Sequence, residues 1–348
     1  MRSDKSLWIF QGLKLFAGAG LGAAILMSGA SPAGAFGHDK LRDTINRLTQ
    51  PPPAPRQAPA PAAKPTPAPT AQTPPPPPRR RAPKRSITQI AGDVYQFKNN
   101  FHNSAFMVTP SGVILVDPIN KGASAWLKAE LSRRFNRSVR YVIYSRDHAD
   151  HISGGEVFAD SAIFIAHAAA KRDIIDEARP TQAPDITFTD TMTVELGGKM
   201  AVLSFVGRNH SDNSIVVSFP AERVLHVVDF IPVKSVAFRD LPDTYLDDWF
   251  TSLKNVEAMD FDILSPGHGR LGNKDDVRAF RGYLTSLRDQ VTKLARAGRS
   301  ADEVAATVTM DKYRNWSGYD RFIKHNVRGM YGLVQQNRRP NLRPRPPR

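Results

Sequence analysis

The stretch Tyr141–Gly155 reads YVIYSRDHADHISGG, and its two halves have different characters. The first half is a short apolar run that predicts a buried strand. Two imidazoles and a carboxylate follow within four residues, at His148, Asp150 and His151. Side chains on a turn after a strand can converge on one point, and imidazole and carboxylate are ligands that suit zinc. The stretch therefore predicts a metal site at the end of a strand.

The rest of the composition limits which ligands such a site can use. The chain has 348 residues and no cysteine, which excludes disulfides and thiolate ligands. Any metal site must therefore be built from His, Asp or Glu. The length suits one large domain or two small ones with a sizeable buried core.

Further polar motifs stand at the ends of other apolar strands, in a definite order along the chain. They are NSAFMV and ILVDP before the opening stretch, and VGRNHSDNS with His210, LHVVDF with Asp229, and SPGHG with His268 after it. Any one of these motifs is a weak signal, whereas the ordered set is specific.

This set resembles the metallo-β-lactamase superfamily. The superfamily motif is H-x-H-x-D-H, followed by a distant His, a bridging Asp at a strand end and a His in a G-H-G-type loop. Here the match is R-D-H-A-D-H at Arg146–His151, then His210, Asp229 and His268. The resemblance covers roughly Ile87–Arg270. It implies an α/β fold, a four-layer αββα sandwich, with a helical C-terminal extension.

The resemblance also implies two metal positions. Its residues are Arg146, His148 and His210 for the first, Asp150, His151 and His268 for the second, and Asp229 between them. Arg146 departs from the pattern, because a guanidinium stays protonated and only donates hydrogen bonds, so it cannot coordinate zinc. We therefore expect one Zn²⁺ ion in the second position, with Asp229 as a candidate fourth ligand.

The expected activity follows from that ion. It would lower the pKa of a bound water from 15.7 toward about 7, and the resulting hydroxide would attack an ester, lactam, lactone or thioester bond. We expect Asp150 to steer a proton to the leaving group and Arg146 to hold a substrate carboxylate or the developing oxyanion. His148 and His210 would serve in hydrogen bonding or proton transfer. A second interpretation is that Arg146 only pairs with Asp147 or Asp229.

The alternative function is a non-catalytic binding protein on a degenerate metallo-β-lactamase scaffold, because a fold alone does not confer an activity. Several other polar and aromatic residues are predicted to be structural. His102, His167 and His226 lie in or beside apolar strands and are predicted core or edge histidines, Asp117 and Asn103 are predicted to support loops, and Trp249 and Phe250 are predicted core residues that could instead line a groove.

The N-terminal region predicts export. Residues 1–35 combine early basic residues with the apolar run Leu15–Ala30 and end in Ala33-Gly34-Ala35, a small-x-small pattern. An apolar run of about 16 residues is short for a membrane span, which needs roughly 20. We therefore predict a signal peptide cleaved after Ala35 and a periplasmic or secreted protein.

Charge and composition divide the rest of the chain. The flanks 1–35, 36–85 and 336–348 carry +2, +8 and +5, which account for the whole net charge of +15. Residues 86–335 are therefore neutral overall, which disfavours a nucleic-acid partner and favours a small-molecule substrate. Residues 36–85 are predicted to be a proline-rich basic linker, 86–290 the metallo-β-lactamase-like domain, 291–335 the helical extension and 336–348 a Pro/Arg-rich tail. The basic flanks could contact an anionic membrane or cell-wall polymer.

Overall fold

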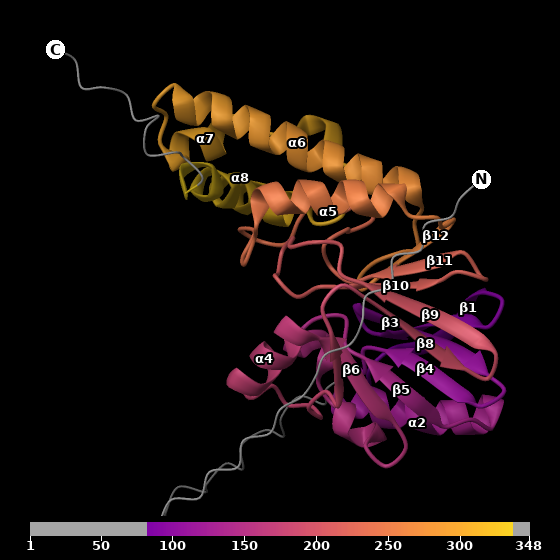
Figure 1. Cartoon of the computed structure of the whole chain (residues 1–348). Coiled ribbons are helices and arrows are strands. Elements are labelled where there is room, and N and C mark those ends of the chain that lie inside the picture. Colours follow the sequence, from indigo (N-terminus) through magenta and orange to yellow (C-terminus); the bar gives the residue numbers. More distant parts are fainter. Residues whose placement is uncertain (1–81, 337–348) are drawn as a thin grey trace, which may run out of the picture. The chain divides into compact units, whose positions relative to one another are not determined.

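The computed structural model describes residues 82–336. The predicted signal peptide lies outside this range, as do nearly all of the predicted linker and the predicted tail. In the described part, two β-sheets pack face to face between two sets of helices, which gives four layers (Figure 1). None of the helices in this range is both long and apolar enough to cross a bilayer.

The first sheet contains seven strands in the order β1-β2-β3-β4-β5-β6-β7. The first four are antiparallel neighbours, and β4 to β7 run parallel. Parallel neighbours need a crossover connection, and here helical segments provide it. The strands are β1 (Arg85–Ala91), β2 (Val94–Asn99), β3 (His102–Thr109), β4 (Gly112–Val116), β5 (Val139–Ile143), β6 (Ile163–His167) and β7 (Ile186–Phe188).

The second sheet contains five strands in the order β12-β11-β10-β9-β8. Only β11 and β12 are parallel neighbours. The turn between β8 and β9 has Gly197 and Gly198 at positive φ, as a two-residue hairpin turn requires. The strands are β8 (Thr191–Leu196), β9 (Lys199–Ser204), β10 (Val216–Phe219), β11 (Val224–Val227) and β12 (Ile263–Pro266).

The core between the sheets follows from the two-residue period of a strand. In β3, Met107 packs toward the second sheet, whereas Phe106 packs toward the helices on the outer face. Strand β4 repeats this pattern with Ile114 facing inward and Leu115 facing outward. Both faces of the central strands are therefore buried, which explains why these segments are almost continuously apolar.

Helices cover both outer faces. On the first sheet they are α2 (Lys121–Phe135) and α4 (Ala168–Asp176), with the short α3 (Ala149–Ile152) and η1 (Gly155–Phe158) in the connection between β5 and β6. On the second sheet they are α5 (Leu246–Ala258), α6 (Lys274–Arg296), α7 (Ala301–Thr307), η2 (Asp311–Tyr313) and α8 (Tyr319–Gln336). Figure 1 shows α2 and α5 on opposite sides of the two sheets. The structure confirms the predicted four-layer α/β sandwich with C-terminal helices.

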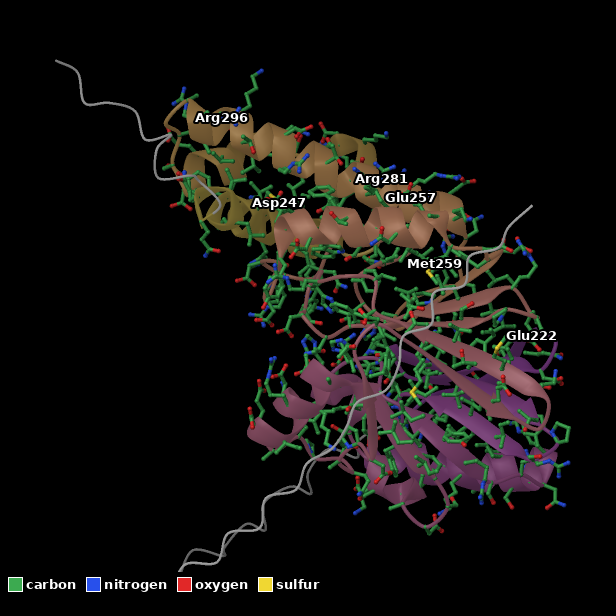
Figure 2. The ribbon with its side chains drawn as sticks, in the orientation of Figure 1. Glu222, Asp247, Glu257, Met259, Arg281 and Arg296 are labelled. Carbon is green, nitrogen blue, oxygen red and sulfur yellow. The ribbon has the colours of Figure 1, made fainter. Side chains whose placement is uncertain are left out.

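Helix α6 joins the sandwich to the C-terminal helices. It begins at a capping box formed by Asn273 and Asp276, and it pairs with α5 through Arg281, whose Nη2 donates to Glu257 Oε2 at 3.0 Å (Figure 2). The predicted domain boundary between residues 290 and 291 lies inside this helix. The division of the chain into domains stays a prediction.

Candidate metal centre

The predicted site residues lie where strands of both sheets end at one edge. Arg146 to His151 follow β5, and His268 follows β12. Asp229 follows β11 with φ at 67°, a left-handed conformation that aspartate tolerates better than most residues. His210 lies on the loop between β9 and β10. Residues far apart in sequence therefore meet because their strands end at the same edge.

The first of two donor groups contains four residues. It consists of His102, Asp150, His151 and His268, and their ligand atoms all lie within 4.8 Å of one another. His151 Nε2 and His268 Nε2 are 3.1 Å apart, and Asp150 Oδ2 lies 3.4 Å from His102 Nε2. Asp150 Oδ2 is also 3.7 Å from the Nε2 atoms of both other histidines. Three imidazoles and one carboxylate converging in this way fit a zinc ion.

The surroundings of this donor group hold its rings in place. His268 Nδ1 bonds to the carbonyl oxygen of Phe101 at 2.8 Å, so its Nε2 is the atom that faces the other donors. The carboxylate of Asp117 accepts from Ser145 N and Ser145 Oγ, and its Oδ2 lies 3.6 Å from His151 Nδ1. No hydrogen bond joins His151 Nδ1 to this carboxylate at that distance, so the contact between them is electrostatic.

A glycine makes room for the group. A Cβ atom on Gly267 would lie 2.6 Å from Val228 Cγ1 and 2.9 Å from His151 Cε1. Any larger residue at this position would push the loop that carries His268 away from His151. The close approach of the β12 loop to the first sheet therefore depends on Gly267.

A second donor group contains His148, His210 and Asp229, and its ligand atoms also lie within 4.8 Å of one another. The guanidinium of Arg146, which is fully buried, reaches into this half of the site. Its Nη2 donates to Asp229 Oδ2 and lies 3.3 Å from Asp150 Oδ1. A fixed positive charge thus occupies the half of the site that the superfamily pattern gives to a first metal ion.

The charges of this half follow from burial and from Arg146. Burial raises the pKa of Asp229, but the charges of Arg146 and His151 outweigh burial and hold that pKa well below its usual range. Burial and Arg146 together lower the pKa of His210 to about 3, and they also lower the pKa of His148. Both imidazoles are therefore neutral near pH 7, while the carboxylate stays ionised.

The protonation of the first donor group differs from that of the second. Burial lowers the pKa of His268, yet contacts with Asp150 and Asp229 outweigh it and raise that pKa to about 10. Burial holds the pKa of His151 well below its usual range. In the metal-free site, His268 is therefore the positively charged ring and His151 is the neutral one.

The sequence profile of the metallo-beta-lactamase superfamily matches residues 98–268, which carry every predicted site residue. Residues 98–268 therefore belong to the metallo-β-lactamase superfamily. The alignment to the superfamily ends at His268, so the helices α6 to α8 lie beyond the matched part.

Several characterised proteins are similar to this superfamily member. The alpha subunit of 2,4-dinitroanisole O-demethylase from Nocardioides sp. (strain JS1661) is 25% identical over 191 residues, which are 53% of this chain and 58% of that subunit. Metallo-beta-lactamase type 2 from Bacillus cereus is 27% identical over 184 residues, which are 49% of this chain and 68% of that enzyme. This chain thus spans only part of the length of these relatives.

Solved structures show the same fold at low sequence identity. A metallo-beta-lactamase from Pontibacter korlensis aligns with a TM-score of 0.53 and 18% identity, covering 58% of this chain and 99% of that one. A metallo-beta-lactamase from Hirschia baltica aligns with a TM-score of 0.51 and 18% identity, covering 58% and 97%. These similarities establish the metallo-β-lactamase fold and leave the reaction open.

His102 is a candidate donor that the sequence-based prediction did not include. It was predicted to be a core or edge histidine, yet its ring lies 4.8 Å from the ring of His268 and belongs to the first donor group. Backbone contacts hold it there, because His102 and His268 form an isolated β-bridge. The side chain of Asn103 binds Pro266 O and Gly269 O, which ties β3 to the same loop.

The other residues predicted to be structural lie in packed environments. His167 stacks on Phe205 with ring centroids 4.4 Å apart, and His226 is buried in β11 with Nδ1 3.2 Å from Ser265 Oγ. Phe250 is a core residue. Trp249 also packs in the core and donates to Phe230 O at 3.0 Å, although its ring borders the cleft above the donor groups.

His226 predicts an acid-dependent loss of stability in this metallo-β-lactamase fold. Burial lowers its pKa from 6.5 to about 4, so the unfolded chain binds a proton below pH 6.5 that the folded chain does not bind until about pH 4. Stability therefore falls as the pH drops through this window, by roughly 3 kcal/mol at about 1.4 kcal/mol per pH unit. Urea unfolding at pH 7.5 and pH 4.5 measures it. His226→Leu should remove that part of the pH dependence, and an unchanged dependence in the variant would contradict the assignment.

Proposed function

We propose that this chain is a metal-dependent hydrolase that holds a single divalent cation and cleaves an ester, lactam, lactone or thioester in a small molecule. The observation that carries the proposal is the asymmetry of the site. Four donors converge in one half, at His102, Asp150, His151 and His268, while the guanidinium of Arg146 occupies the other half. A metallo-β-lactamase site with one half filled by an arginine supports one ion rather than two.

The residues that would hold the cation are those four donors, and Asp229 Oδ1 is a further candidate at 3.2 Å from His268 Nε2. Asp229 Oδ1 is buried and has no hydrogen-bond partner of good geometry among the described residues. A buried carboxylate oxygen without a partner carries a desolvation cost that a cation would offset. When bound, such a cation polarises an acyl carbonyl and brings the pKa of a bound water near 7.

Arg146 would supply the charge of the missing second ion. Its Nε and Nη1 atoms are buried and have no hydrogen-bond partner among residues 82–336. The residue also borders the cleft that opens onto the site. Donors preorganised in a site that excludes water are well suited to stabilise negative charge that develops on a reacting oxygen. We assign this role to Arg146.

The proton-transfer groups follow from the charges. Burial raises the pKa of Asp150, but His102, His268 and Arg146 outweigh burial and hold it far below the usual range. Asp150 is therefore ionised at working pH, which favours the ligand role over the proton-transfer role expected from the superfamily. His148 is neutral and borders the cleft, so we assign the acceptance of a proton to its imidazole, with His210 beside it at 5.5 Å between ring centroids.

Elemental analysis combined with a substrate panel tests the proposal. We expect one ion per purified chain and hydrolysis of at least one member of an ester, lactone, thioester and lactam panel. Dialysis against a chelator should remove both the ion and the activity, and one equivalent of Zn²⁺ should restore the activity. A metal-free protein that remains fully active would overturn the proposal.

The second candidate function is a non-catalytic binding protein on this scaffold. The observation that favours it is His102, because four protein donors can close a zinc coordination sphere, and closed spheres are typical of structural sites. One tightly held ion with no turnover of any panel member would support this function. One ion with turnover would exclude it.

A further inference from the structure

A cleft opens directly above the two donor groups. Its volume is about 610 Å³, which lies within the ~300–1,000 Å³ typical of small-molecule sites. The polar residues of the donor groups form its floor, and its walls are mostly apolar. One wall comes from the loop after β11 and from α8, which lies beyond the part of the chain that matches the superfamily.

Exposed phenylalanines gather at this cleft. Phe101 is 82% exposed and Phe238 is 63% exposed, and they are the only exposed phenylalanines among residues 82–336. Both line the cleft. Phe322 supports Phe238 from α8, with ring centroids 5.3 Å apart. Solvent-exposed apolar side chains that line a cleft indicate a surface that binds an apolar group.

An arginine stands among these rings. Arg321 is exposed on α8 and lines the cleft, and no carboxylate among residues 82–336 lies within ion-pair distance of it. Its guanidinium lies 4.9 Å from the centroid of the Phe322 ring, which holds the charge against the apolar wall. The wall therefore offers a guanidinium beside apolar surface, with its bidentate donors available to a ligand.

The balance of charge in the cleft favours an anion. Two carboxylates, Asp150 and Asp229, face the floor, and Arg146 compensates one of them. A divalent cation in the first donor group would leave the floor with one excess positive charge before a bound water ionises and with none afterwards, and Arg321 adds a positive charge in either state. A cleft whose net charge has one sign and whose walls are apolar attracts ligands of the opposite charge.

We propose that Arg321 binds the carboxylate of an amphipathic substrate whose aliphatic or aromatic body lies between Phe101 and Phe238. The hydrolysable carbonyl of that substrate then lies over the donor groups on the floor. This inference rests on the proposed hydrolase function and adds its substrate class. It also gives the C-terminal extension a role, because α8 supplies the residue that selects the substrate.

A matched pair of esters tests the inference on the zinc-loaded full chain. Mono-4-nitrophenyl adipate carries a terminal carboxylate, and 4-nitrophenyl hexanoate carries a methyl group at the same chain length. We expect Arg321→Gln to lower kcat/KM for the adipate by about 10- to 100-fold and to change the hexanoate less than 2-fold, as the loss of one charged hydrogen bond predicts. Lys324→Gln removes a charge from the same helix outside the cleft and should alter neither.

Binding without turnover separates this inference from the hydrolase proposal. Calorimetry with 4-phenylbutyrate and 4-phenylbutyramide should show tighter binding of the carboxylate, and Arg321→Gln should remove the difference. If neither ester is cleaved but this preference depends on Arg321, the inference stands and the hydrolase proposal fails. If the esters are cleaved and Arg321→Gln affects both probes and both esters equally or not at all, the inference is overturned and the hydrolase proposal stands.

Discussion

His151→Asn is expected to abolish tight zinc binding and, with it, hydrolysis. His151 is the fully buried member of the first donor group, and its Nε2 lies 3.1 Å from His268 Nε2. Structural zinc sites with four ligands reach about 10–16 kcal/mol of binding free energy, or about 3 kcal/mol per ligand. The loss of one ligand should therefore weaken binding by at least about 100-fold. The proposed role of the cation is to bring the pKa of a bound water near neutrality, so its loss should also remove hydrolysis.

The measurement is zinc affinity by competition with a chromophoric chelator, together with turnover of the best panel substrate. Because His151 is buried, a second variant guards against misfolding. His268→Gln alters a half-exposed ligand on a loop and should weaken binding by a similar factor. His325→Gln changes an exposed histidine on α8 and is the control. Retention of tight zinc binding in both ligand variants would rule out the first donor group as the metal site.

Arg146→Met is expected to destabilise the fold by about 3–5 kcal/mol, the usual result of removing one partner from a buried ion pair. Arg146 is fully buried, and it is the group that most strongly keeps the carboxylate of Asp229 ionised. Methionine fills a similar volume but leaves that carboxylate without its positive partner. Unfolding by urea, monitored by circular dichroism, measures the change.

Arg146→His should restore part of that stability in the presence of zinc and raise the bound metal from one ion to two. The new imidazole would join His148, His210 and Asp229, which already lie close enough to share an ion. Elemental analysis gives the stoichiometry. Arg223→Met, which removes an exposed arginine paired with Asp260 and Asp262, is the matched control and should keep one ion. One ion in both variants would show that the arginine does not exclude the second cation.

The predicted meeting of distant residues rested on where the strands end. Apolar runs before His148 and His268 predicted buried strands, and buried strands of a layered α/β fold end at shared edges. The resemblance to a known family then ordered these ends around one site. The comparisons confirm the predicted fold. The structure also brings the Nε2 atoms of His151 and His268 to 3.1 Å from each other. The metal and catalytic roles of these residues stay predictions.

The departures from prediction come from tertiary contacts that no local pattern records. His102 begins an apolar strand and resembles any core histidine, and only the β-bridge to His268 brings it to the donors. Two acidic partners were considered for Arg146 from the sequence, and it pairs with Asp229, whereas Asp147 pairs with Arg179 at 2.9 Å. Arg321 became a candidate only once α8 was seen to pack against the second sheet.

Arg146 has one more consequence, which concerns the supply of metal. A cation that is part of the polypeptide has no dissociation constant, so chelation or dilution cannot strip it from the site. When zinc is scarce, a site with two exchangeable ions loses both positive charges. This site keeps the charge of its guanidinium, which continues to hold the side chains of Asp229 and Asp150 in position. Under the proposed single-ion site, the protein needs to capture only one ion from its environment, and its occupancy should follow a single hyperbolic titration.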